Sequence, residues 1–494
     1  MGRRKVRQRN LARLPFLFFD LLFCFIALVS TAQAQLQPRA DSGGGRSGPV
    51  RGEISPVSTS ITQTQSQLPG AAKVTPAPSQ LSLATAIDLA ISNNLATLLT
   101  HEQRREAAGI KQQARSGLLP NVDANSFQAS VTENLAAFGF QPGTFPGITQ
   151  AFIGPFKNFD ARARLVQNIF DLSIIRNYQS SRAGERLAEY RERLAREQVS
   201  EATALTYLEA LRTERNVSAA QANVELATAL LKLAQDQRNA GVATGVDVTR
   251  AETRLAQERV NLAQSNTASE QARLNLQRVI GVPLGSPLVL TDPLRFLDEA
   301  PPGPEAAVGQ ALSSRNEVLI SQAQVDVLDL QRKSVKGELL PSLQFLADYG
   351  VSGITPTDTA LPTRRVAVQL NVPIFNGGLT LGRLTVASSR EQQAELELNS
   401  VKGQVEEDVR LALSALHTNV ERVRAADEAF RLAQRELEMS RDRFRAGVAD
   451  NLEVISAQTS LANARADQVE ALAAYNAARL NLAASLGRAE TFRW

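Results

Sequence analysis

The sequence predicts a mainly α chain with a minor strand content, built as two tandem helix–strand–strand–helix repeats. A shift of 206 residues overlays Gly241-Val242-Ala243 on Gly447-Val448-Ala449 without gaps. The same shift overlays Ala272-Arg273-Leu274 on Ala478-Arg479-Leu480. Two copies of about 200 residues are too few and too long for a solenoid of short repeats. They indicate a duplicated unit that builds one symmetric object.

Residues 1–34 have the composition of a secretory signal peptide. Six basic side chains lie within residues 3–13, and an apolar run follows from Phe16 to Val29. Ala32-Gln33-Ala34 then fits the small-x-small cleavage pattern. A membrane anchor is the alternative, but Asp20 leaves the apolar run short for a spanning helix. We therefore expect an exported chain that begins near Gln35.

Cleavage changes the charge balance of the chain. Residues 1–34 hold six of the 54 basic and one of the 50 acidic residues, which leaves 48 basic and 49 acidic residues. A nearly neutral chain gives no reason to expect a nucleic-acid partner. The one cysteine, Cys24, leaves with the signal peptide, so packing and assembly rather than disulfides must stabilise the exported protein.

The segment 35–79 is rich in Gly, Ser, Pro, Thr and Gln and has no periodic apolar face. We expect it to be disordered. Its run Gly43-Gly44-Gly45 lacks the preceding strand and following helix of a phosphate-binding loop.

The first helix of each repeat is predicted over 83–118 and 304–339. Leu118-Leu119-Pro120 and Leu339-Leu340-Pro341 end the two helices, because the residue before a proline is driven out of the helical region. Each repeat then has two strands that alternate between polar and apolar residues. Arg162, Arg164, Val166 and Asn168 are predicted on one side, opposite Ala163, Leu165, Gln167 and Ile169. We expect the second strands to end at Ile169-Phe170-Asp171 and Ile374-Phe375-Asn376.

A very long helix follows the strands of each repeat. Residues 173–239 and 379–446 contain no proline, and about 67 residues at 1.5 Å each make a rod of roughly 100 Å. Apolar residues recur at steps of three and four in the second rod, which predicts a coiled-coil seam: Leu398, Val401, Val405, Val409, Leu416, Val420, Val423 and Phe430. The last helix of the first repeat is predicted over 246–280, half the length of a rod.

The four strands need partners outside one chain. No apolar run after the signal peptide approaches 18 residues, so a membrane-spanning role would fall to the strands. Four strands cannot close a barrel, because the smallest membrane barrels have eight. A dimer would supply eight strands and a trimer twelve, and twelve leave room for a lumen. An ordinary soluble hairpin in each repeat is the alternative.

The chain resembles the TolC-type outer-membrane efflux proteins over nearly all of residues 80–487. The resemblance rests on the duplicated element order, the paired Leu-Leu-Pro helix ends, the paired strand ends, and two turn motifs. These motifs are Arg238-Asn239-Ala240-Gly241-Val242 with Asp247-Val248, and Phe444-Arg445-Ala446-Gly447-Val448 with Leu452-Glu453-Val454.

The resemblance implies a homotrimer with a 12-stranded outer-membrane β-barrel, continued by a 12-helix periplasmic α-barrel. It assigns 80–281 and 304–487 to the two structural repeats. Residues 282–303 become an equatorial linker, and 488–494 a C-terminal tail. It also implies that the turns at 238–247 and 444–453 form the periplasmic tip, where the pore closes and an adaptor binds.

Several tip residues carry the predicted function. Glu453 matches an acidic ring position of the family, and Asp450 would add to the negative potential that favours cations. Asp247 matches an aspartate of the family's closing contacts, and a helix N-cap is its alternative role. Phe444 and Ala449 replace the family's polar partners, so we expect altered closure. Gly241 and Gly447 are predicted to end the long helices, beside Val242 and Val448 at the adaptor contact.

Two aromatic segments give weaker signals. The predicted loop 134–159 contains six phenylalanines, which we interpret as an aromatic belt at the lipid interface or a cover over the barrel mouth: Phe138, Phe140, Phe145, Phe152, Phe156 and Phe159. The chain ends in Phe492-Arg493-Trp494, which resembles the C-terminal signal of outer-membrane barrels although it follows a helix.

No constellation of catalytic residues is present, and His101 and His417 lack metal-ligand spacing, so neither an enzyme, a metal site nor a cofactor is predicted. The resemblance implies a passive duct of an efflux pump or type I secretion system. Its partners would be a periplasmic adaptor, an inner-membrane pump and outer-membrane lipid. Two alternatives are an exported coiled-coil scaffold and a periplasmic adaptor without a pore. The sequence names neither the cargo nor the pump class.

Overall fold

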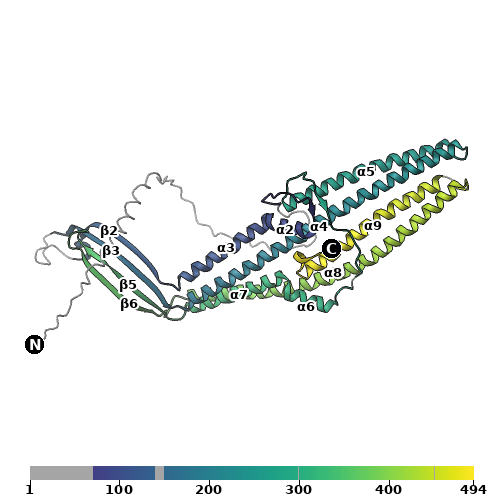
Figure 1. Cartoon of the computed structure of the whole chain (residues 1–494). Helices are drawn as coiled ribbons and strands as arrows, with labels where there is room; N and C mark the ends of the chain where they lie inside the picture. The colour runs from purple at the N-terminus through teal and green to yellow at the C-terminus, as the bar shows by residue number, and fades with distance from the viewer. Residues whose placement is uncertain (1–69, 140–149, 299, 450, 494) are drawn as a thin grey trace, which may run out of the picture. The chain divides into compact units, whose positions relative to one another are not determined.

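The computed structural model describes residues 70–139, 150–298, 300–449 and 451–493, all within the unit that spans Thr62–Trp494. Its first half contains α2 (Leu83–Asn93), α3 (Leu95–Ser116), β2 (Asn121–Asn134), β3 (Phe152–Phe170), α4 (Leu172–Asn239) and α5 (Gly245–Ile280). Its second half repeats that order with α6 (Pro304–Ser314), α7 (Asn316–Gly337), β5 (Ser342–Gly353), β6 (Leu361–Asn371), α8 (Leu379–Arg445) and α9 (Asn451–Ser485). In Figure 1 the strands lie at one end of the helices, and the α4–α5 and α8–α9 turns lie at the other.

The first helix of each half is broken, contrary to our prediction of continuous helices over 83–118 and 304–339. Asn94 adopts an extended conformation between α2 and α3, and its side chain accepts a 2.8 Å hydrogen bond from the backbone of Ala96. Arg315 is extended between α6 and α7, where its guanidinium pairs with Glu317 and with Asp408 of α8, each at 2.8 Å. Local capping and tertiary ion pairs therefore override the helical periodicity at both breaks.

The four main strands form one antiparallel sheet in the order β2-β3-β5-β6. Arg164 pairs with Asp348 and Ala163 with Tyr349, which confirms the predicted alternation of strand faces. One face carries most of the polar side chains, and we call it the polar face: Asn121, Asp123, Asn125, Asp160, Arg162, Arg164, Asn168, Gln344, Asp348, Thr363, Arg365, Gln369 and Asn371. The opposite, apolar face carries Val122, Ala124, Ala163, Leu165, Phe345, Ala347, Tyr349, Val366, Val368 and Leu370.

Strand β6 ends at Asn371, so the prediction that it ends at Ile374-Phe375-Asn376 was wrong. Pro373 has no amide hydrogen to donate to a ladder, which ends the pairing there. Ile374 and Phe375 are left 94% and 87% exposed between the sheet and α8. Two glycines with positive φ, Gly377 and Gly378, then turn the chain into the helix.

The predicted loop 134–159 is shorter in the structure. Leu135–Phe138 forms a 3-10 helix, residues 140–149 lie outside the described part of the chain, and β3 already begins at Phe152. Between Phe152 and Asn158 this strand pairs with β2 alone, because its pairing with β5 starts at Phe159. A strand edge without a partner tolerates Pro155, which has no amide hydrogen to donate to a neighbouring strand.

The two long helices have 68 residues in α4 and 67 in α8, as predicted. The predicted seam of α8 is also confirmed, because Leu398, Val405, Val409, Leu416 and Val423 are buried. They pack with Ala307, Val308 and Ala311 of α6, and with Tyr475 and Ala478 of α9. Among the described residues, no helix combines the length and apolarity that are needed to cross a bilayer.

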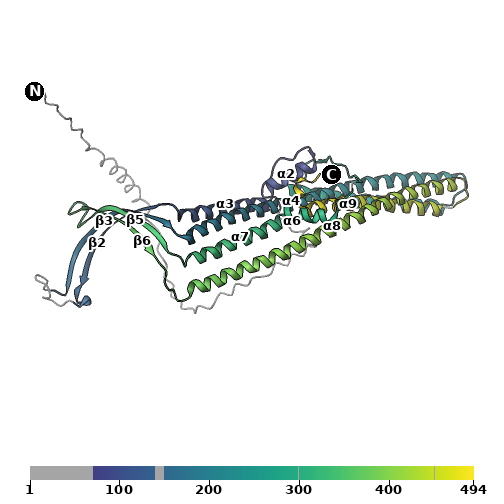
Figure 2. The same ribbon diagram turned by 90° about the horizontal axis from the view of Figure 1, so that it is seen from below.

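Short segments gather at mid-length of the long helices, around α2 and α6 (Figures 1 and 2). Strand β1 (Gln80–Leu81) pairs in parallel with β4 (Val289–Leu290) of the linker. The buried Tyr207 of α4 donates to the carbonyl oxygen of Leu81 at 3.0 Å and to Asp292 at 2.7 Å. Near the C-terminus Phe492 is buried, 5.6 Å from the guanidinium of Arg479. These contacts tie the linker and tail to α4 and α9.

Residues 70–79 are packed against the helices, although we expected them within the disordered segment. Ala71 forms a β-bridge with Asn94, and the amide of Thr75 donates to the carbonyl of Gly281 at 2.9 Å. Backbone pairing of this kind does not depend on side-chain hydrophobicity, so the polar composition concealed it. The earlier residues of that segment lie outside the described part of the chain.

Candidate functional site

The α4–α5 and α8–α9 turns lie at the end of the helices that is remote from the sheet (Figure 2). Both long helices end in the same way. Gly241 and Gly447 have φ values of 73° and 71°, the left-handed region that favours glycine. The amides of Val242 and Val448 reach back to the carbonyls of Gln237 and Arg443 at 2.9 and 3.1 Å. Each turn is thus a Schellman motif, and both glycines end their helices as predicted.

The two turns touch each other and expose apolar side chains. A Cβ placed on Gly447 would lie 3.4 Å from Cγ1 of Val242. Val242 and Val448 are largely exposed, and so are Val246 and Leu452 in the first turns of α5 and α9. An exposed apolar group at a helix turn is suited to contact another protein. The predicted adaptor contact at Gly241, Val242, Gly447 and Val448 stays a prediction.

Asp247 forms the capping box of α5. Its carboxylate accepts hydrogen bonds from the backbone amide and the hydroxyl of Thr244, at 2.8 and 2.7 Å. These bonds, with a smaller contribution from Arg250 at 3.8 Å, hold the pKa of Asp247 below its ordinary value. Thr244 is therefore the N-cap of α5, and Asp247 supports it from the third helical position instead of being the N-cap that the sequence offered as an alternative.

Asn451 joins the two hairpins, and sequence reasoning missed it. Its side-chain amide donates a 2.8 Å hydrogen bond to the backbone carbonyl of Asp247. The residue is buried although it begins α9. Nothing local in the sequence indicates this bond, because its partner lies 204 positions away.

Phe444 lies in a hydrophobic core and is only 5% exposed. It packs with Leu230 of α4, Leu437 of α8, and Val454 and Leu461 of α9. We expected Phe444 at the periplasmic tip, among the residues where the pore closes, and that role stays a prediction. In the single chain its side chain fills the space between helices, because burial stabilises an apolar ring.

Glu453 lies in the first turn of α9, where a carboxylate is favoured by the helix dipole. It faces two polar residues of α8. Its carboxylate is 3.6 Å from the guanidinium of Arg443 and 3.4 Å from the hydroxyl of Ser440. The predicted ring acid is therefore partly neutralised within its own chain. Asp450, the second predicted acid, lies outside the described residues.

The polar face of the sheet holds a row of charges that sequence reasoning did not assemble. Asp123, Arg164, Asp348 and Arg365 stand directly opposite one another on successive strands. Their signs alternate across the sheet, and Arg365 bonds Asp348 at 2.9 Å. Arg162 adds ion pairs to Asp348 and Asp160. Charges that pair on one face of a sheet need water or each other, so this face is not suited to lipid.

His101 has an acidic neighbour in the structure, Glu192 at 3.1 Å. Within residues 70–139, 150–298, 300–449 and 451–493, His, Cys, Asp and Glu form no group of three or more that is arranged to hold a metal ion.

A family model described as "Outer membrane efflux protein" matches residues 86–282 and 307–488, the greater part of both halves. The chain belongs to the outer membrane efflux protein family. This membership confirms the predicted resemblance and places the protein in the outer membrane, extending into the periplasm.

Curated relatives agree with this assignment. The chain is 25% identical over 321 residues to the alkaline protease secretion protein AprF of Pseudomonas aeruginosa, covering 63% of this chain and 65% of AprF. It is 27% identical over 259 residues to the outer membrane efflux protein BepC of Brucella suis, covering 52% of this chain and 54% of BepC. The aligned segments thus span less than two thirds of each relative.

Solved structures show that the fold is that of an outer-membrane channel. The chain aligns with the CmeC outer membrane channel of Campylobacter jejuni with a TM-score of 0.70 and 17% identity. The alignment covers 82% of this chain and 86% of CmeC. The members of the matched family are outer membrane efflux proteins, a class of transport protein.

Proposed function

We propose that this chain is the outer-membrane exit duct of a tripartite efflux pump or a type I secretion system. The four-stranded sheet carries the argument. It has one apolar and one polar face, which suit lipid on the outside and water on the inside. In the described part of the chain, β2 and β6 each have a strand partner on one side only. Open strand edges do not occur in a bilayer, so copies of the chain must join to close the sheet.

A homotrimer with twelve strands meets this requirement and leaves a lumen. The same three copies would place α3, α4, α7 and α8 of each chain in a 12-helix wall that continues the barrel. Helices of 68 and 67 residues supply about 100 Å of that wall. In this proposal the two repeats span 80–281 and 304–487, while residues 282–303 and 488–494 belong to an outer belt at mid-length.

The chain acts in this proposal as a passive conduit. It needs no cofactor, catalyses no reaction, and binds no nucleic acid. An inner-membrane pump supplies the energy, and a periplasmic adaptor docks at the exposed apolar residues of the two turns. AprF is named for protease secretion and BepC for efflux, so both kinds of cargo remain within this function, and the pump selects among them.

Conductance in a planar lipid bilayer tests the proposal. We expect the purified protein to form discrete channels of uniform orientation, which open further when the turns are loosened by Asn451→Ala. Asn419→Ala is the matched control, because among the described residues the Asn419 side chain forms its hydrogen bond within its own helix, to the carbonyl of Ala415. Membranes that stay insulating with folded protein inserted, for the parent and the loosened variant alike, would contradict a duct.

A further inference from the structure

The two sides of one chain carry complementary surfaces for a second copy. Strand β2 with α3 forms one side, and β6 with α8 forms the other (Figure 1). We propose that these sides join in one definite register, with Asn371 of β6 opposite Asn121 of the next copy. In the same register, Ile110 of the next copy enters a cavity of α8. This inference rests on the proposed trimeric duct and specifies how its copies pair.

The strand ends fix the register. Both strands end at the helical side of the sheet, β2 at Asn121 and β6 at Asn371. If these ends are level, the 11 residues of β6 pair with residues 121–131 of the next copy. A shift by one residue would turn apolar side chains to the polar face, so only even shifts are compatible with the faces.

The strand tilt supports level ends. A row of paired residues starts at Asn121 and crosses the sheet to Ala367 of β6. Ala367 lies four residues before Asn371, the end of β6. If Asn371 pairs with Asn121 of the next copy, a row of paired residues therefore shifts by four residues along the strands per copy, and by twelve around a trimer. With about 3.3 Å per residue and about 4.8 Å between strands, this shift corresponds to a tilt of about 35°, within the usual range for barrels. Untilted closure, with Ala367 opposite Asn121, would not give a barrel of normal geometry.

The side chains match in this register. On the polar face, Gln369 lies opposite Asp123 of the next copy, where an amide donates to a carboxylate. On the apolar face, Leu370 lies opposite Val122 and Val368 opposite Ala124. These three pairs continue the polar and apolar faces across the joint, whereas Arg365 lies opposite Phe127 on the polar face in the same register.

Helix α3 has a face that its own chain leaves uncovered. Arg104 and Lys111 turn toward α4, where they pair with Glu192 at 2.9 Å and Glu185 at 2.7 Å. The opposite face carries Leu99, Glu106 and Ile110, all exposed. Glu106 makes no ion pair with any described residue of its own chain. An apolar pair with one unpaired acid is suited to another helix that offers a hollow and a base.

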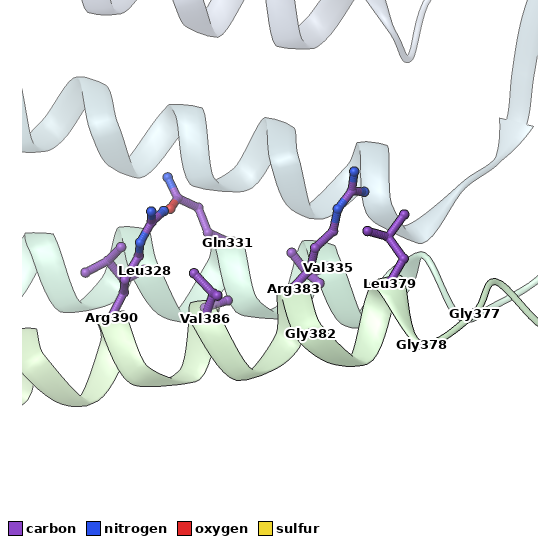
Figure 3. A pocket seen from close by; sticks show the side chains of 11 residues that line it. Leu328, Gln331, Val335, Gly377, Gly378, Leu379, Gly382, Arg383, Val386 and Arg390 are labelled. Atoms are coloured by element: carbon purple, nitrogen blue, oxygen red, sulfur yellow. The ribbon is translucent and has the colours of Figure 1, made fainter. Parts of the chain in front are cut away.

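Helix α8 offers both, in a cavity of about 490 Å³ that it forms with α7 (Figure 3). Leu328 and Val335 of α7 and Val386 of α8 supply apolar walls. Gly382 leaves open space, since a Cβ there would meet no atom within 4 Å. Arg383 and Arg390 project from the same side of α8 (Figure 3).

The two arginines differ in their partners. Arg383 is paired with Glu338 at 3.1 Å, whereas Arg390 forms no ion pair within the part of the chain that the structure describes. The cavity therefore offers one base that is available to an incoming acid.

The positions along the two helices agree with the strand register. Helix α3 runs toward the sheet and ends at Ser116, while α8 starts beside the sheet at Leu379. Six residues back from Ser116 lies Ile110, and seven residues on from Leu379 lies Val386. Ten and eleven residues along lie Glu106 and Arg390, each about 16 Å from the end of its own helix that is nearer the sheet. When α3 of one copy lies beside α8 of the other, Ile110 enters the cavity at Gly382 and Val386, and Glu106 contacts Arg390.

Disulfide trapping tests the strand register. Cys24 is the one cysteine of the sequence and lies in the predicted signal peptide, so introduced cysteines report without background. We expect Gln369→Cys with Asp123→Cys to give several-fold more covalent trimer on non-reducing gels than Ala367→Cys with Asp123→Cys. Residues directly opposite are within disulfide range, and a displacement by two residues exceeds it. A trimer that is trapped by the displaced pair would overturn the register and leave the duct standing.

Charge exchange tests the helix contact. We expect Glu106→Arg or Arg390→Glu alone to lower the temperature at which the trimer dissociates, and the double variant to recover most of the loss. Arg105→Glu is a matched control on the same helix, because Arg105 already pairs with Glu102 at 2.9 Å. If both single variants lower the dissociation temperature and the double variant does not restore it, the proposed contact between Glu106 and Arg390 is wrong. A parent protein that forms no trimer would overturn the proposed duct and this interface together.

Discussion

The side-chain amide of Asn451 donates a 2.8 Å hydrogen bond to the backbone carbonyl of Asp247, and so joins the turn of one half of the chain to the turn of the other. Asp247 is itself fixed by the capping box with Thr244. The start of α9 is thereby tied to the start of α5. Any opening at this end that separates the two hairpins must break the bond or carry both helix starts together.

Replacement of Asn451 by alanine is predicted to loosen both turns. It removes the donor and leaves the Asp247 carbonyl without this partner, a loss of about 1 kcal/mol. Hydrogen exchange should become faster in residues 240–250 and 446–452, with no change at mid-length of α4. Asn419→Ala, whose bond is local to α8, should leave exchange at the turns unaltered. Unchanged protection in the Asn451 variant would show that the bond does not couple the hairpins.

Acid is predicted to weaken the start of α5 through Asp247. Its pKa in the folded protein is below the ordinary value of 3.8, so its stabilising effect is complete above that value and is lost as the pH falls through the folded value. Asp247→Ala should cost about 1 kcal/mol at pH 7. The difference between variant and parent should shrink below about pH 3.8, measured as exchange protection of residues 245–250. A constant difference from pH 7 to pH 2.5 would contradict the capping role.

Ion selectivity should respond in opposite directions to Glu453 and Arg443. Glu453→Gln is predicted to lower the ratio of cation to anion permeability, because it removes negative charge from the tip. Arg443→Gln should raise the ratio, since it leaves Glu453 without the guanidinium 3.6 Å away. Reversal potentials in a salt gradient measure both effects. Asp467→Asn, an exposed acid further along α9, serves as the control, and equal ratios in all variants would place Glu453 outside the ion path.

Bulky charged residues at Gly241 and Gly447 are predicted to impair coupling to the pump before they impair assembly. Each glycine has a positive φ, so substitution adds a strain of about 1 kcal/mol. It also places a charge beside Val242 and Val448. Transport assays in cells and trimer content on native gels separate the two effects. Gly184→Glu, in the part of α4 near the sheet, controls for the added side chain because a Cβ there would meet no atom within 4 Å. Loss of the trimer in the turn variants would make Gly241 and Gly447 purely architectural.

Glu201→Gln is predicted to stabilise the protein at neutral pH. Burial raises the pKa of Glu201, and Glu317 adds to the effect against the opposing influence of Arg315. A raised folded pKa means that the charged form is disfavoured, so stability is greatest at low pH and declines as the pH rises through that value. Glutamine resembles the protonated form, and the gain in thermal midpoint at pH 7 should disappear by pH 4. Exposed Glu225 of the same helix, changed to Gln, should show no such gain.

The sequence was sufficient for elements that are long and periodic. The lengths of α4 and α8, the seam from Leu398 to Val423, and the alternation around Arg164 follow from local pattern. Breaks set by tertiary contacts were not predictable, since Arg315 leaves the helix to pair with Asp408, which lies 93 residues away. The end of β6 was misplaced because a matching Ile-Phe pair was given more weight than Pro373.

The residues of the candidate site likewise divide into those that local sequence predicts and those whose contacts lie far away in the sequence. The turns at Gly241 and Gly447 could be predicted from residue type alone, because few residues other than glycine adopt a positive φ. Asn451 and Arg443 act on residues of another helix, and single-sequence patterns contain no signal for such contacts. The prediction for Phe444 rested on its alignment with a polar position of the family. Its apolar ring instead packs in the hydrophobic core.

Single-particle electron microscopy of the detergent-solubilised protein tests the central claim most directly. The duct predicts a hollow cylinder with threefold symmetry, with about 100 Å of helical wall and a barrel that adds about 40 Å with its interfacial regions. At side-chain resolution, Asn371 should lie opposite Asn121 of the next copy. A monomer, or a solid rod without a lumen, would contradict the account.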